Sequence, residues 1–124
     1  MRILLDTHVF IWWMAADPRF PAQWVPSVID PANTVFLSAA TAWEIASKRR
    51  SGKLAFEHAL HDADDVHGFE WLAIDQVDAE RAGSLEWSHP DPFDRMLVAQ
   101  AARHDLVLAT ADAAVRTAAT VRFL

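Results

Sequence analysis

The sequence predicts an α/β fold, a three-layer α/β/α sandwich in which a central, mainly parallel sheet lies between two layers of helices. Short apolar runs alternate with segments of helical periodicity along the whole chain. These runs are apolar throughout rather than alternating with polar residues, which is typical of strands covered on both faces. At 124 residues, the chain is expected to form a single domain spanning residues 1–124.

The first half of the chain is expected to hold two strand–helix units with a short helix between them. The expected strands are Arg2–Leu5 and Thr34–Leu37, and the expected helices are Thr7–Ala16, Ala22–Ile29 and Ala39 to about Arg50. Ser38 suits the N-cap position of the third helix, and Gly52 stands where that helix should stop.

The second half is expected to continue this alternation. The expected helices are Glu57–Phe69, Val77–Trp87, Phe93 to about His104 and Ala111–Ala119, and the expected strands are Trp71–Ile74, Leu106–Ala109 and Thr120–Leu124. The helix from Phe93 has the clearest start, because Asp91 can cap it and Pro92 suits its first position.

Charge and composition exclude several classes of protein. The net charge is −6 with the histidines neutral, which is the wrong sign for holding nucleic acid by overall attraction. Binding RNA would therefore need metal ions or a local basic patch. The chain has no cysteine and hence no thiol chemistry. No apolar run is long enough to span a membrane, and the start does not look like a signal peptide, so we expect a cytoplasmic protein.

Four acidic residues stand where a parallel sheet would gather them. Asp6 and Asp112 follow expected strands, and Asp94 lies in the first turn of a helix. Ligands of such sheets bind beyond the carboxyl ends of the strands. Glu44 lies on a helix between Trp43 and Ile45, where an unpaired charge is costly.

Each acid also has a local explanation. Asp6 could be a turn residue, Asp94 a partner of the helix dipole, Asp112 an N-cap and Glu44 a solvated position. Together, however, four such acids would repel one another unless a cation lay among them. Carboxylate oxygens are the ligands that Mg²⁺ prefers.

Four motifs, in order and spacing, carry a family resemblance. They are Asp6-Thr7-His8, Ser38-Ala39-Ala40 with Trp43-Glu44-Ile45, Asp91-Pro92-Phe93-Asp94-Arg95 followed by Leu97-Val98-Ala99-Gln100-Ala101, and Thr110-Ala111-Asp112. Nearly the whole chain resembles the PIN-domain family in this way, and the motifs are most similar to those of VapC-type toxins. The resemblance implies a PIN-like fold and a magnesium-dependent endoribonuclease that is the toxin of a type II toxin–antitoxin pair.

The resemblance also implies an acidic site made of Asp6, Glu44, Asp94 and Asp112. We expect the three aspartates to hold one or two Mg²⁺ ions, with Mn²⁺ as a substitute, and Glu44 to help position the metal or its water. Bound Mg²⁺ would activate a water molecule for attack on an RNA phosphodiester and offset the charge that builds on the phosphate.

Several other side chains have a functional and a structural interpretation. Thr7, Ser38 and Thr110 could support the site with their hydroxyls, or could simply cap a helix and end strands. Arg95 could neutralise the site or touch a phosphate, or form a surface ion pair. The basic cluster Lys48, Arg49, Arg50 and Lys53 could contact RNA or only complement a helix dipole. The six histidines form no zinc pattern and are expected to be solvated.

The expected partners are the RNA substrate and a cognate antitoxin protein, in a homodimer or a toxin–antitoxin hetero-oligomer. Two other functions remain open. A phosphorylation-switch receiver domain has similar length and strand-end acids, but it should show an acid pair after the first strand and a lysine after the last. A non-catalytic PIN module should have lost an acid, and none is missing here. The segment 57–68 matches nothing diagnostic, so the substrate RNA is not identified.

Overall fold

The computed structural model describes residues 1–124 and confirms the expected α/β/α fold. Its sheet has five strands in the order β3-β2-β1-β4-β5, and all four neighbouring pairs are parallel. The strands are β1 (Arg2–Leu5), β2 (Thr34–Ser38), β3 (Glu70–Leu72), β4 (Val107–Ala109) and β5 (Arg122–Phe123). The first strand is therefore central, and chain order reverses on either side of it.

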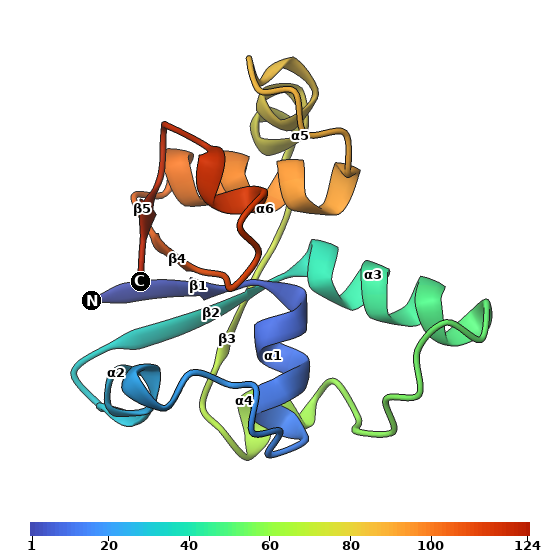
Figure 1. Ribbon diagram of the computed structural model, residues 1–124, viewed down its shortest axis with the longest axis vertical. Helices are drawn as coiled ribbons and strands as arrows, with labels where there is room; N and C mark the ends of the chain where they lie inside the picture. Colours follow the sequence, from blue (N-terminus) through green and yellow to red (C-terminus); the bar gives the residue numbers. More distant parts are fainter.

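Helices cover both faces of this sheet (Figure 1). The helices are α1 (Thr7–Met14), α2 (Val25–Ile29), α3 (Ala39–Arg50), α4 (Asp62–Asp65), α5 (Gln76–Ser84) and α6 (Pro92–Arg103), with 3-10 turns η1 (Ala22–Trp24) and η2 (Val115–Thr117). Figure 1 shows α1, α2 and α4 on one side of the sheet and α5 and α6 on the other. Helix α3 follows β2 and contacts both α1 and α6. No helix is long and apolar enough to cross a membrane.

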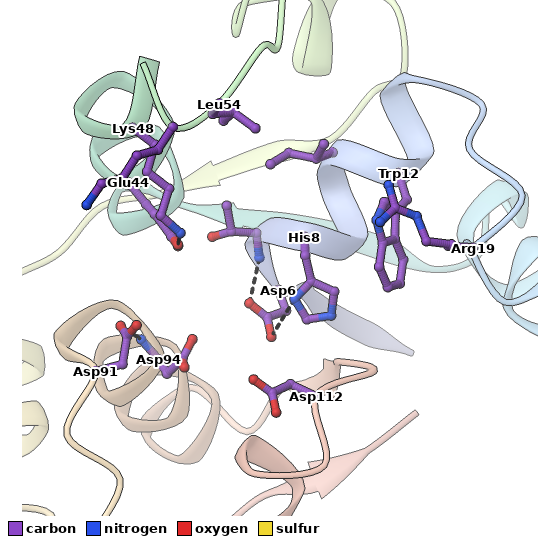
Figure 2. A pocket seen from close by; sticks show the side chains of 13 residues that line it. Asp6, His8, Trp12, Arg19, Glu44, Lys48, Leu54, Asp91, Asp94 and Asp112 are labelled. Carbon is purple, nitrogen blue, oxygen red and sulfur yellow. Dashed lines mark hydrogen bonds and ion pairs between the residues drawn. The ribbon is translucent and has the colours of Figure 1, made fainter. Parts of the chain in front are cut away.

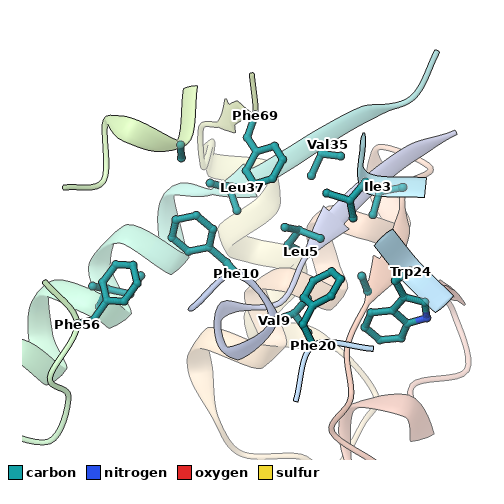
Figure 3. Packing of buried hydrophobic residues seen from close by; sticks show 14 residues of the cluster. Ile3, Leu5, Val9, Phe10, Phe20, Trp24, Val35, Leu37, Phe56 and Phe69 are labelled. Atoms are coloured by element: carbon teal, nitrogen blue, oxygen red, sulfur yellow. The ribbon is translucent and has the colours of Figure 1, made fainter. Parts of the chain in front are cut away.

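The hydrophobic core consists of two clusters, one on each face of the sheet, because successive side chains of β1 point to opposite faces. Ile3 and Leu5 pack into the larger cluster with Phe10 of α1, whereas Leu4 packs into a second cluster with Leu97 of α6. Figure 3 shows the larger cluster, to which α1, β1, β2 and irregular segments all contribute. Each fully buried aliphatic side chain contributes about 1.5–3 kcal/mol to stability, so both faces of the sheet are held by apolar burial.

Three expected helices were wrong in extent. In place of Glu57–Phe69, only Asp62–Asp65 is helical, because Gly68 adopts a positive φ of 70° and turns the chain into β3. In place of Ala111–Ala119, only η2 forms. Helix α5 ends at Ser84 rather than Trp87. Strand β3 is Glu70–Leu72 rather than Trp71–Ile74, and β5 is only Arg122–Phe123.

The end of α3 is a sharp turn that matters for the site. Gly52 has a φ of 74°, a left-handed conformation that favours glycine. Its amide donates to the Arg49 carbonyl, and the Lys53 amide donates to the Lys48 carbonyl at 2.9 Å. These hydrogen bonds close the helix and turn the chain back alongside it.

Candidate functional site

One cavity of about 440 Å³ lies beyond the carboxyl end of β1. Among its 13 lining residues are five carboxylates, Asp6, Glu44, Asp91, Asp94 and Asp112. Figure 2 shows Asp6, Asp94 and Asp112 directed toward a common space, although they come from opposite ends of the sequence. The four acids singled out in the sequence therefore line one cavity.

Asp6 is buried at the start of α1, with 2% of its surface exposed. Its Oδ1 accepts the Thr7 amide at 2.7 Å, and its Oδ2 accepts the Thr110 hydroxyl at 2.6 Å. Burial raises the pKa of Asp6, while nearby His8 and these hydrogen bonds oppose the rise. The pairing of Leu5 with Ala109 in the sheet brings Asp6 and Thr110 side by side.

Asp94 occupies the first turn of α6, which Asp91 caps by accepting the amides of Phe93 and Asp94. The Asp94 carboxylate turns away from the cap and lies 2.6 Å from His89 Nε2. Burial raises the pKa of Asp94 to about 6, helped by the charges of Asp6 and Asp91 and opposed by His89. Asp94 is thus more than a helix-start residue.

Glu44 is only 7% exposed, so the solvated position considered for it was wrong. It lies one helical turn before Lys48 on α3, and the Lys48 ammonium forms an ion pair with its carboxylate. A buried carboxylate is costly unless it is paired. Lys48 therefore balances the Glu44 charge in the absence of other cations.

Asp112 and Thr110 are joined at the end of β4. The Asp112 amide donates to the Thr110 hydroxyl oxygen at 3.1 Å, and Asp112 Oδ1 accepts the Ala114 amide at 2.9 Å. Asp112 is therefore not the expected N-cap, since Ala114 occupies that position of η2; its side chain holds the turn before η2 and also lines the cavity. Because the Thr110 hydroxyl contacts both Asp6 and Asp112, it fixes the two acids relative to each other.

Three of the four expected supporting residues do not line this cavity: Ser38, Arg95 and Thr110. Thr110 is connected to it only through its hydrogen bonds with Asp6 and Asp112. Ser38 caps α3 by accepting the Ala40 amide at 3.0 Å and donates to Gln100 Oε1 at 2.5 Å. Arg95 directs its guanidinium at backbone carbonyls between Ala82 and His89, including that of Trp87 at 2.6 Å. Ser38 is therefore a helix cap, and Arg95 holds the α5–α6 connection.

Thr7 does line the cavity, and its hydroxyl lies 3.0 Å from that of Thr41. Thr41 is fully buried, and nothing in the sequence marked it as important. This contact ties the start of α1 to α3, which carries Glu44.

Sequence reasoning missed three cavity-side residues. His8 Nδ1 lies 3.4 Å from Asp6 Oδ2, and His89 contacts Asp94, so neither is simply solvated as expected. Asp91 was expected only as a cap, yet it also lines the cavity. The adjacency of His8 to the Asp6-Thr7 pair was the one sequence signal that could have indicated its role.

The donor set fits a hydrated divalent cation. All the acids present oxygen atoms, and the raised pKa values of Asp6 and Asp94 show that burial and crowded negative charge disfavour their ionised forms. No three carboxylate or histidine side chains form a ready-made ligand group. Mg²⁺ usually keeps several waters and takes only one or two carboxylates, so it does not require a ready-made group of three.

The family model described as PIN domain matches residues 3–120. The chain belongs to the PIN-domain family. PIN domains are typically nucleases, and the acidic cavity of this PIN domain lies at the strand ends, where such a parallel sheet binds ligands. No curated protein sequence matches the chain.

Several solved structures are similar to this PIN domain over most of its length. DNA-bound VapBC from Salmonella typhimurium gives a TM-score of 0.72 at 19% identity, covering 100% of this chain and 97% of that one. FitAcB from Neisseria gonorrhoeae gives 0.69 at 25% identity, with 98% and 96% covered. A toxin–antitoxin complex from Klebsiella pneumoniae gives 0.60 at 23% identity, with 89% and 86% covered. These similarities support the PIN fold over nearly the whole chain.

Proposed function

We propose that this PIN domain is a magnesium-dependent endoribonuclease that acts as the toxin of a type II toxin–antitoxin pair. One observation carries the proposal: four acids from separate parts of the chain, Asp6, Glu44, Asp94 and Asp112, line one cavity at the carboxyl end of the sheet. Family membership makes a nuclease the natural use of such a cavity.

The residues have distinct roles in this proposal. Asp6, Asp94 and Asp112 hold Mg²⁺, or Mn²⁺ in its place, and Glu44 positions the ion or its water. Bound Mg²⁺ supplies an activated water and charge neutralisation at the phosphate. Thr110 orients Asp6 through its 2.6 Å hydrogen bond, and Thr7 donates its amide to the other oxygen of the same carboxylate.

Near neutral pH the cavity is ready to bind a cation. The pKa of Asp94 is about 6, so this carboxylate is mostly ionised at pH 7. Glu44, on the opposite side of the cavity, forms an ion pair with Lys48. A phosphate would be repelled by these acids on their own, which is why binding RNA here depends on the metal.

The antitoxin partner is supported by a groove beside the cavity. Trp12 and Trp13 line this groove of about 460 Å³ together with Pro18, and Trp12 also lines the acidic cavity. An inhibitor bound in the groove would cover Trp12 and block the cavity. One solved structure of similar fold is a toxin–antitoxin complex. We propose that the PIN domain is cytoplasmic and forms a homodimer or a hetero-oligomer with its antitoxin.

A receiver domain and a non-catalytic PIN module are the two alternative functions. Membership of the PIN-domain family excludes a receiver domain. A non-catalytic PIN module keeps the fold without the chemistry, and the cleavage assay below separates it from an enzyme.

The test is cleavage of total cellular RNA by the purified protein, with Mg²⁺ and with excess chelator, followed by mapping of the ends. We expect cleavage only with the metal, leaving 5′-phosphate and 3′-hydroxyl ends, because water and not the 2′-hydroxyl is the nucleophile. Cyclic 2′,3′-phosphate ends, or equal cleavage in chelator, would contradict the assignment.

For the toxin role, we expect expression alone to slow growth and a small protein encoded beside this chain to bind it and restore growth.

A further inference from the structure

The structure separates the four basic residues at the end of α3 into two groups. Arg49 donates to the carbonyls of Phe56 at 2.6 Å and His58 at 2.5 Å, so its guanidinium is fixed in a structural contact. Arg50 is exposed and lies outside the acidic cavity. Lys48 and Lys53 are the two members of the cluster that line the cavity. Complementing the helix dipole does not explain why only these two face the acids.

Lys48 lies among the carboxylates. Its ammonium pairs with Glu44 (Figure 2), and its side chain lines the same cavity as Asp91 and Asp94. The lysine therefore places a cation on the α3 side of the cavity. A phosphate held over the acids would meet this ammonium.

Lys53 is a second cation, placed at the rim by the turn at Gly52. Its amide is bound to the Lys48 carbonyl at 2.9 Å, and the next residue, Leu54, packs against the larger core cluster. The backbone at Lys53 is thus held on both sides. Its exposed ammonium has no carboxylate within 4.0 Å, unlike that of Lys48.

The third cation on the cavity wall, Arg19, is already paired with an acid. The Arg19 guanidinium forms hydrogen bonds to both oxygens of Asp17, with a shortest distance of 2.7 Å, and lies over the Trp12 ring. Of the cavity's three cations, Lys53 is consequently the one without an acidic partner. An RNA strand has little other attraction available at this site, because the chain as a whole is acidic.

We propose that Lys48 and Lys53 form a phosphate-binding rim that holds the RNA backbone next to the scissile phosphodiester. This inference rests on the proposed function. It identifies the side of the cavity on which the RNA strand is bound. Lys53 provides the free charge at the rim, and Lys48 contacts the phosphate nearer the acids once the metal shares the charge of Glu44. The strand therefore enters along the end of α3.

The first experiment measures the affinity for a fluorescent single-stranded RNA at several salt concentrations. Ca²⁺ replaces Mg²⁺, and gels confirm that the RNA stays intact. Each phosphate contact to a single strand contributes about 0.7 to the slope of log affinity against log salt. We expect Lys53→Met to reduce the slope by about 0.7, and Arg50→Met, which removes the same charge from the same helix end, to leave it unchanged. Equal slopes for wild type and Lys53→Met, or equal losses in both variants, overturn the proposal.

The second experiment uses the opposite effects expected of Lys48. Lys48→Met removes a cation that repels Mg²⁺ and competes for Glu44, so we expect tighter Mg²⁺ binding by calorimetry and weaker RNA binding. A lysine that merely supports the fold would weaken both, and that result overturns its role at the phosphate.

These experiments distinguish a failure of the phosphate-binding rim from a failure of the proposed function. If wild type cleaves RNA with Mg²⁺ while Lys53→Met and Arg50→Met bind RNA alike, the phosphate-binding rim is refuted and the nuclease assignment is retained. If wild type neither cleaves nor binds RNA, both the nuclease assignment and the phosphate-binding rim are refuted.

Discussion

The imidazole of His89 lies 2.6 Å from the carboxylate of Asp94, between Nε2 and Oδ2. His89 belongs to the break before α6, whereas Asp94 belongs to the first turn of that helix. Burial and neighbouring acids raise the pKa of Asp94 to about 6, and His89 limits this rise. The contact thus links a loop residue to the protonation state of a proposed metal ligand.

Replacing His89 should shift the pH dependence of metal binding. Without the imidazole, the pKa of Asp94 rises further, so protons compete with Mg²⁺ at higher pH. We expect His89→Ala to bind Mg²⁺ more weakly than wild type at pH 6, with a much smaller deficit at pH 8. Calorimetric titrations at the two pH values measure this, with exposed His61→Ala as the control. A deficit of the same size at both pH values would assign His89 a packing role only.

The stability of the metal-free protein should fall as pH rises from about 4 to 6. The folded-state pKa of Asp94, about 6, lies above its ordinary value of 3.8. In this window the folded state binds a proton that the unfolded state has lost, so raising the pH reduces the free energy of unfolding. The raised pKa of Asp6 acts in the same direction.

Urea denaturation in chelator at pH 4.5 and 6.5 measures this loss of stability. We expect the loss to be smaller in Asp94→Asn, because that variant has no carboxyl group to titrate. Asp65 is exposed on α4, so Asp65→Asn should behave like wild type. An identical loss in wild type and Asp94→Asn would refute a raised pKa at Asp94.

Ser38 and Thr110 should differ in which property they support. Ser38→Ala removes a helix cap and the hydrogen bond to Gln100, and should lower the free energy of unfolding by about 1–3 kcal/mol. Thr110→Val removes the donor to Asp6, and should weaken Mg²⁺ binding about 10–100-fold, as is typical of residues that orient metal ligands. Denaturation and calorimetry on both variants separate the two effects, and weaker Mg²⁺ binding in Ser38→Ala alone would reverse these roles.

Local signals in the sequence were enough to predict most of the fold. Ser38 and Asp91 both cap helices as expected, and Pro92 begins α6. Each of these signals acts within a few residues, so neighbouring sequence decides the outcome. The strand–helix alternation then determines that the sheet is parallel and that strand-end acids meet at one edge.

The segment 57–69 could not be predicted because tertiary packing decides its path. Its flanking aromatic residues, Phe56 and Phe69, are both buried in the larger core cluster. An irregular backbone with one short helix lets both rings reach that core, whereas a continuous helix would fix their separation. Helical periodicity alone contains no information about this constraint.

The acids of the site could be predicted, but their partners could not. Strand and helix positions placed Asp6 and Asp112 at one edge, whereas the contact of His89 with Asp94 depends on how the loop before α6 folds. The orientation of Arg95 toward the carbonyls of the α5–α6 connection likewise depends on the packing of those helices.

In the proposed function, Asp6, Asp94 and Asp112 share one metal site. Melting temperatures of wild type and of the Asp6→Asn, Asp94→Asn and Asp112→Asn variants, each recorded in chelator and in excess Mg²⁺, test it most directly. A ligand that binds only the folded state raises its stability by mass action, so wild type and the control Asp65→Asn should gain on adding Mg²⁺ and the three variants should gain less. Equal gains in all five proteins would contradict a shared site.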